Sequence, residues 1–195
     1  MSDATHRILL VDDDINVLKA LRRVLSLTPC VAGNQRFKLA IEAYDSPHAA
    51  LAMAHERSYD LVLSDYRMPG MDGTEFLTAF RALQPHAARL ILSGYADLNG
   101  LIKAINEVGI QRFIAKPWND YELVSAVAHA LALRDVTLEN ERLADLARLA
   151  SGHITPQEIE LKRLELEEPG ITHVEWDTDG SVLLIDPLQY KEPPL

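Results

Sequence analysis

The feature that most constrains the fold is a set of four short apolar segments, each ending in a polar group. These groups are Asp12, Asp65, Ser93 and Lys116. A short apolar run followed at once by turn residues is typical of a buried strand in a parallel sheet. Ligands bind beyond the carboxyl ends of the strands in such sheets, so we expect the four side chains to meet at one edge.

The groups expected at this edge match the needs of phosphoryl transfer. Carboxylates at Asp12, Asp13 and Asp65 would repel one another without a cation. Mg²⁺ resolves such a cluster, since it binds one or two carboxylates and accepts phosphate oxygens. A carboxylate beside Mg²⁺ can also act as a nucleophile and form an aspartyl phosphate. Lys116 and the Ser93 hydroxyl would then stabilise the charge on the phosphoryl oxygens.

Taken singly, each of these residues has a commoner interpretation. An acidic run after a strand is usually an exposed loop or a helix cap, which is our interpretation of Asp14. An Asp before Pro-Gly is most often a turn former. Their joint occurrence at four strand ends favours the functional interpretation. Cys30 is the only cysteine, which excludes a disulfide or a cysteine-based zinc cluster within the chain.

Four motifs at these strand ends resemble those of the receiver domains of bacterial two-component response regulators. They are LVDDD at 10–14, SDYRMPGMDG at 64–73, LSGYAD at 92–97 and FIAKPW at 113–118. The motifs occur in the family's order. The resemblance covers residues 5–135, which we expect to form the receiver domain.

The resemblance assigns a phosphorylation site and a metal site. It implies that Asp65 is the phosphoacceptor. It also implies that Mg²⁺ is bound by Asp12, Asp13, Asp65 and the backbone carbonyl of Arg67. A sensor histidine kinase or a phosphotransfer protein would supply the phosphoryl group.

The resemblance also implies a switch. Ser93 is similar to the hydroxyl that moves toward the bound phosphoryl group, and Lys116 to the lysine that contacts it. Phe113 stands where the family keeps an aromatic switch residue, which turns inward once Ser93 moves.

Strand and helix patterns alternate along the receiver segment. Helices are expected at 15–25, 47–56, 74–83, 100–108 and from 120 onward. Such alternation predicts an α/β fold with a five-stranded, doubly wound parallel sheet in flavodoxin-like order. The stretch 26–37 contains Pro29 and Gly33, and we expect it to be a long surface loop.

The last receiver helix is expected to continue to residue 150, because no Pro or Gly interrupts it after residue 120. One heptad assignment places Leu133, Asn140 and Ala147 at position a, with Val136, Leu143 and Ala150 at position d. A single Asn at a sets the register of parallel two-stranded coils. Residues 136–150 would therefore form a homodimer coil. The alternative is a helix that packs on its own C-terminal module.

Residues 151–195 are expected to form a small acidic module. Thr155-Pro156-Gln157-Glu158 is a capping box, which predicts a helix to Glu167. Two apolar runs, 171–176 and 181–185, flank Asp-Thr-Asp-Gly and predict a β-hairpin. These 45 residues hold ten acidic and three basic side chains of a chain with net charge −10.

Composition narrows the function. Binding to nucleic acid depends largely on neutralising phosphates, so the acidic module argues against DNA as a partner. The apolar runs are too short to span a membrane, and a single cysteine suits the cytoplasm. We expect a response regulator that signals through association with an unidentified output protein and is not a turnover enzyme. The alternatives are a Mg²⁺-dependent phosphotransfer enzyme and a regulator of a cyclic-di-GMP enzyme acting in trans.

Overall fold

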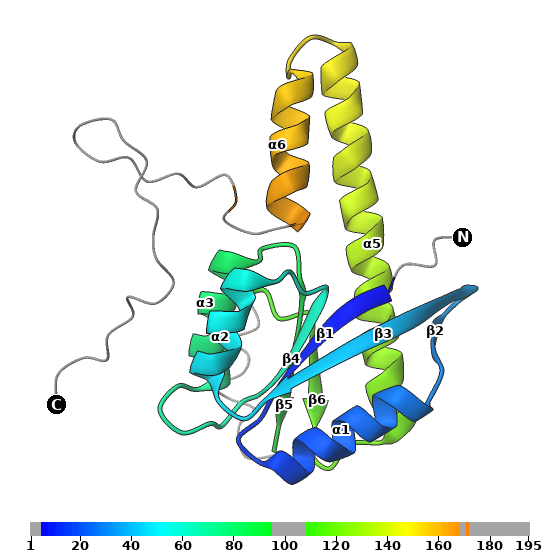
Figure 1. The fold of residues 1–195 in the computed structure, drawn as a ribbon. Helices are drawn as coiled ribbons and strands as arrows, with labels where there is room; N and C mark the ends of the chain where they lie inside the picture. Colours follow the sequence, from blue (N-terminus) through cyan, green and yellow to red (C-terminus); the bar gives the residue numbers. More distant parts are fainter. Residues whose placement is uncertain (1–4, 95–107, 168–170, 172–195) are drawn as a thin grey trace, which may run out of the picture.

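The computed structural model describes residues 5–94, 108–167 and 171. Helices cover both faces of one twisted sheet, and a helical arm extends from one end of it (Figure 1). The strands are β1 (Thr5–Val11), β2 (Cys30–Ala32), β3 (Gln35–Tyr44), β4 (Leu61–Asp65), β5 (Ala88–Ser93) and β6 (Arg112–Ala115). The helices are α1 (Ile15–Leu27), α2 (Pro47–Glu56), α3 (Gly73–Leu83), α5 (Asp120–Ala150) and α6 (Pro156–Glu167).

The sheet order is β2-β3-β1-β4-β5-β6. All of these strands except β2 run parallel to one another. This confirms the α/β class and the flavodoxin-like order. The expected strand count was wrong by one. β2 pairs antiparallel with β3 through a two-residue turn, in which Gly33 has a φ of +56°.

The expected surface loop at 26–37 was therefore also wrong. Cys30 and Phe37 are paired across the hairpin, and both are buried in the core. Their burial explains why this stretch pairs with the sheet and does not remain in solvent. Gly-Asn between two short runs is a hairpin signal, which the presence of Pro29 obscured.

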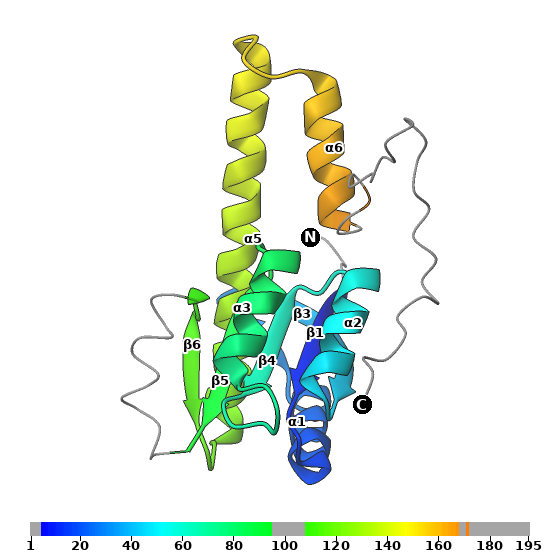
Figure 2. The same cartoon turned by 90° about the vertical axis from the view of Figure 1, so that its left-hand side faces the viewer.

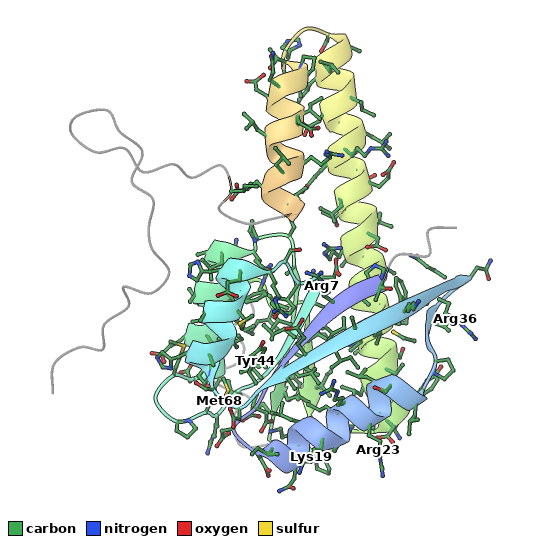
Figure 3. All side chains as sticks on the ribbon, in the orientation of Figure 1. Arg7, Lys19, Arg23, Arg36, Tyr44 and Met68 are labelled. Atoms are coloured by element: carbon green, nitrogen blue, oxygen red, sulfur yellow. The ribbon has the colours of Figure 1, made fainter. Side chains whose placement is uncertain are left out.

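Two hydrophobic clusters lie on opposite faces of the sheet, because successive strand side chains point to opposite sides. Leu10 and Leu63 face α1 and α5, whereas Leu9 and Val62 face α2 and α3. Figure 3 shows side chains filling the space between helices and sheet, while Lys19 points from α1 to solvent. The buried layers hold the strand ends in place.

The helix starts follow the local sequence signals. Asp14 caps α1, as the sequence predicts, and Ser46 and Asn119 cap α2 and α5. α3 begins one residue earlier than expected, because Asp72 forms a capping box with Glu75. The predicted helix at 100–108 and the predicted hairpin at 171–185 lie almost entirely outside the described residues.

The C-terminal half of α5 leaves the receiver body as an arm. α5 is 31 residues long and buries its first third against the sheet. α6 then runs back alongside it in the opposite direction, as both views show (Figures 1 and 2). Lys162 of α6 lies 2.8 Å from Asp145 of α5. No helix among the described residues is long and apolar enough to cross a membrane.

The base of the arm is bonded to the amino edge of the sheet. The Arg134 guanidinium lies 2.8 Å from Asp60, which precedes β4. Asp135 lies 3.4 Å from His6 of β1 and accepts a hydrogen bond from Gln35 of β3. Three separate strands thus determine the direction in which the arm leaves the body.

Candidate functional site

The strand register brings the four predicted strand ends to one edge. Ser64 of β4 is level with Val11 of β1, and Ser93 of β5 is level with Ala115 of β6. Main-chain bonds continue past the strands, since the Lys116 amide donates to the Ser93 carbonyl at 2.8 Å. Tyr44 and Met68 lie near this edge (Figure 3). The Lys116–Pro117 peptide bond is cis.

Lys116 joins two of the predicted carboxylates. Its Nζ lies 2.7 Å from Asp12 and 2.6 Å from Asp65. Asp12 is 1% exposed and Asp65 is 6% exposed, whereas the lysine is only partly covered. An ammonium between two buried carboxylates neutralises part of their mutual repulsion.

The two carboxylates also receive main-chain hydrogen bonds. The Asp14 amide donates to Asp12 at 2.9 Å, and the Arg67 amide donates to Asp65 at 3.1 Å. These bonds fix the rotamers of both acids. The bond from Arg67 also places its main chain beside Asp65.

Burial and charge act in opposite directions in this cluster. Burial raises the pKa of Asp12 above its usual 3.8, and the bonds from Lys116 and Asp14 offset this only in part. Burial lowers the pKa of Lys116, but its bonds to Asp12 and Asp65 outweigh that effect and raise it overall. The lysine therefore stays charged, and Asp12 holds a proton more readily than an ordinary aspartate.

Asp12, Asp13 and Asp65 form a group that fits a divalent cation. One carboxylate oxygen from each residue lies within 4.8 Å of the others. Asp13 is exposed and would leave room for water on a bound ion. Oxygen ligands with open, hydrated positions suit Mg²⁺, which keeps several waters and binds phosphate oxygens.

Ser93 and Phe113 stand on β5 and β6, the two strands beyond the one that carries Asp65. Ser93 is buried at the end of β5, next to the strand of Asp65, and its hydroxyl lies 3.3 Å from the Gly94 carbonyl. Phe113 of β6 is half-buried and packs on the cluster facing α2 and α3. It also lines a shallow hollow of about 300 Å³ together with Tyr121.

A comparison with known families agrees with this geometry. Residues 8–128 match the model of the response regulator receiver domain. The chain belongs to this receiver family. Two structural features agree with this membership. They are five parallel strands in flavodoxin-like order and an acid cluster at the carboxyl edge of those strands.

Receivers of several kinds resemble the chain. It is 33% identical over 73% of its length to the hydrogenase transcriptional regulatory protein HoxA of Cupriavidus necator, covering 28% of that protein. It is 32% identical over 68% of its length to the cyclic di-GMP phosphodiesterase response regulator RpfG of Xanthomonas campestris, covering 34% of it. The chain thus spans about a third or less of these two curated relatives.

A solved receiver domain shows the same fold. The signal receiver domain of an HD domain-containing protein from Pseudomonas fluorescens is 34% identical, with a TM-score of 0.58. The match covers 68% of this chain and 99% of that domain. The family model ends at residue 128, before the arm and the acidic module.

Sequence reasoning missed one residue of the receiver site. Gly73 opens α3 directly against the main chain of Asp65, and its amide donates to the Tyr66 carbonyl at 2.8 Å. A Cβ at this position would overlap the Asp65 carbonyl oxygen. Gly73 is the last glycine of MPGMDG, but the sequence alone indicates only that it is a turn residue.

Proposed function

We propose that the chain is a response regulator that accepts a phosphoryl group on Asp65 from a sensor histidine kinase or a phosphotransfer protein. The observation that carries this proposal is Lys116 Nζ within 2.7 Å of both Asp12 and Asp65, beside a third carboxylate at Asp13. The side chains that we propose as nucleophile, metal ligands and counter-charge lie together, which supports this reaction. The family membership supports the same reaction.

In this reaction a carboxylate oxygen of Asp65 attacks the phosphorus of a phosphohistidine. The O–P bond forms while the P–N bond breaks, and the electron pair of that bond leaves on the imidazole nitrogen. Mg²⁺ held by Asp12, Asp13, Asp65 and the Arg67 carbonyl would supply positive charge to the phosphoryl oxygens. Lys116 would exchange its bond to Asp65 for one to a phosphoryl oxygen.

Two further residues would then change conformation in response to the phosphoryl group. The Ser93 hydroxyl, on the strand next to Asp65, would turn to donate to a phosphoryl oxygen. Phe113, two residues along β6 from the level of Ser93, would move into the space that this leaves. The hollow that Phe113 lines with Tyr121 would change shape, which provides a surface for a partner.

We assign the signal to protein association in the cytoplasm and not to DNA binding or turnover. The receiver would occupy residues 5–135, the coil 136–150 and an acidic module 151–195. The ten acids of that module would repel nucleic acid. HoxA is named a transcriptional regulator, but this chain covers only 28% of it.

The test is labelling by acetyl phosphate in the presence of Mg²⁺. The wild-type chain should take up one phosphoryl group, and Asp65→Asn should take up none. Asp14→Asn is the matched control, because it removes a neighbouring carboxylate while Asn remains a good helix cap. Labelling of Asp65→Asn at the wild-type level would refute the assignment, as would loss of labelling in both variants.

A second candidate is regulation of a cyclic-di-GMP enzyme in trans, which the resemblance to RpfG favours. The phosphorylated chain would then change the rate of cyclic-di-GMP hydrolysis by a phosphodiesterase from the same genome. An unchanged rate at saturating chain would remove this candidate. Release of inorganic phosphate from small phosphoesters, well beyond one per chain, would instead favour a Mg²⁺-dependent phosphotransfer enzyme.

A further inference from the structure

The arm and the amino edge of the sheet form the two sides of a large groove. Its volume is about 1980 Å³. Thr5 and Phe37 line it from the sheet, Pro85 from the turn after α3, Leu138 from α5 and Ile159 from α6. Pockets for small molecules are usually about 300–1,000 Å³, so a groove of this size suits a polypeptide segment.

The walls of the groove leave apolar side chains in contact with solvent. Leu146 of α5 and Leu166 of α6 both line it, and they are 44% and 41% exposed. Leu138 and Ile159 line the same space and are half-buried. Leucines between two packed helices are normally covered by the neighbouring helix. The two helices therefore leave apolar surface that a further segment can bury.

Additional burial matters most for α6. It has only 12 residues, and helices shorter than about 12–15 residues are marginal in water unless an apolar face packs on other structure. Lys162 of α6 pairs with Asp145 of α5, but the lysine side chain is 55% exposed. A surface ion pair of this kind stabilises little. We therefore expect α6 to need apolar contacts beyond those with α5.

The groove also differs in charge from the rest of the chain. The described residues that line it include seven Lys and Arg side chains and six Asp and Glu side chains, whereas the whole chain has a net charge of −10. On the wall formed by β2 and β3, Arg36 and Lys38 are exposed and have no ion-pair partner among the described residues. No acidic residue occurs in the stretch 28–41. This wall favours an acidic partner.

We propose that the groove binds the C-terminal segment of the same chain, residues 172–195. This segment contains Trp176 and the apolar run 182–185, which belong to the hairpin that the sequence predicts. A lone hairpin is marginal in water, so these side chains need a surface to pack on. The segment also holds five acidic side chains and one basic side chain, which complements the charge of Arg36 and Lys38.

The course of the chain delivers this segment to the groove. α6 runs back along the arm toward the amino edge, and Glu165 and Leu166 in its last turn line the groove (Figure 2). Residues 172–185 can extend over about 46–50 Å, at roughly 3.3–3.6 Å per residue. A small domain is about 30 Å across, so the segment can reach the wall formed by β2 and β3 from the end of α6. Attachment to α6 also gives it an effective concentration of about millimolar, which favours it over a separate partner.

Docking at this place makes the acidic module a cap on the amino edge of the receiver. Asp65 stands at the carboxyl edge of the sheet, so the docked segment leaves the proposed phosphorylation site open. The inference goes beyond the proposed function and does not depend on phosphorylation. Asp65→Asn should keep the segment docked, and loss of labelling in that variant leaves the inference untouched.

The test is hydrogen–deuterium exchange of the full chain, followed in peptides from residues 172–195. In wild type, amides of the apolar runs should exchange at least about tenfold more slowly than in an unfolded chain. Leu146→Glu places a carboxylate on the apolar wall and should raise this exchange by about tenfold or more. Leu143→Glu is the matched control, because Leu143 is a leucine of the same helix, 53% exposed, that does not line the groove. Its exchange should match wild type, and circular dichroism should show that both variants retain their helices.

A second pair of variants tests the charged wall. Lys38→Glu should raise exchange in the segment by about two- to fivefold, because it replaces attraction of the acidic residues by repulsion. Lys19→Glu makes the same change at an exposed lysine of α1 that does not line the groove, and it should have no effect. The difference between wild type and Lys38→Glu should shrink at high salt, since exposed charges are screened.

Three results would overturn the proposal. The first is exchange in wild type that is as fast throughout 172–195 as in an unfolded chain. The second is an equal effect of Leu146→Glu and Leu143→Glu, which would show that the groove wall does not hold the segment. The third is protection that falls on dilution, which would assign the groove to the segment of a second copy.

Discussion

Replacing Lys116 with Met should destabilise the receiver in a way that Mg²⁺ largely reverses. The substitution removes the ammonium that lies 2.7 Å from Asp12 and 2.6 Å from Asp65. Two buried carboxylates are then left facing each other. Folding must either keep both charges without a partner or protonate one of them, and both options cost free energy.

The size of the effect follows from burial. Loss of one partner of a fully buried pair costs roughly 3–5 kcal/mol. The Lys116 side chain is 26% exposed, so solvent screens part of the interaction and we expect about 3 kcal/mol. Lys162→Met removes a lysine that is 55% exposed, and such surface pairs contribute about 1 kcal/mol or less.

Measuring stability with and without Mg²⁺ distinguishes this electrostatic cost from a simple packing defect. Mg²⁺ at a hundred times its dissociation constant should stabilise wild type by about 2.7 kcal/mol. The variant should bind the ion more tightly, because no ammonium competes for its carboxylates. The stability gap between the two proteins should therefore narrow to about 1 kcal/mol in saturating Mg²⁺.

The assay is urea unfolding of wild type, Lys116→Met and Lys162→Met, each with EDTA and with saturating Mg²⁺. The midpoint and slope give the free energy of unfolding for each protein. A loss of stability in Lys116→Met as small as that in Lys162→Met in EDTA would contradict this role of Lys116. So would a stability gap between wild type and Lys116→Met that is the same with and without Mg²⁺.

Two further predictions concern the same edge. Burial raises the pKa of Asp12, so its proton competes with Mg²⁺ at a higher pH than an ordinary aspartate would allow. Calorimetric titration should show Mg²⁺ affinity falling as pH falls toward that raised pKa. The stability of the metal-free protein should depend on pH in the opposite sense, because the pKa of Asp12 is higher in the folded than in the unfolded state. This carboxyl contributes stability below pH 3.8, and the contribution is lost as the pH rises through the pKa of the folded state. Gly73→Ala should cost about 1–3 kcal/mol and slow labelling by acetyl phosphate, because its Cβ displaces the Asp65 main chain. Wild-type stability and rate in that variant would show that the contact is tolerated.

Much of the site was predictable because its residues stand where strands end. Asp12, Asp65, Ser93 and Lys116 each follow an apolar run, and parallel strands deliver their ends to one edge. The helix caps were equally local, since Asp14 and the other caps act on amides two or three residues away.

What sequence could not reveal depends on contacts between distant residues. The steric need for Gly73 arises only when α3 meets the main chain of Asp65. The β2–β3 hairpin was missed because Pro29 suggested a loop, whereas burial of Cys30 and Phe37 holds the strand in the sheet. The heptad pattern of α5 was visible, but the side of the helix that α6 would cover was not.

A single helix connects the two ends of the receiver. α5 is capped by Asn119, three residues after Lys116, so its start moves with the strand that carries the lysine. Its buried residues pack across the sheet, and Arg134 bonds it to Asp60 at the opposite edge. The direction of the arm is therefore fixed by contacts at both edges of the sheet, from the cap that follows Lys116 to the bond with Asp60.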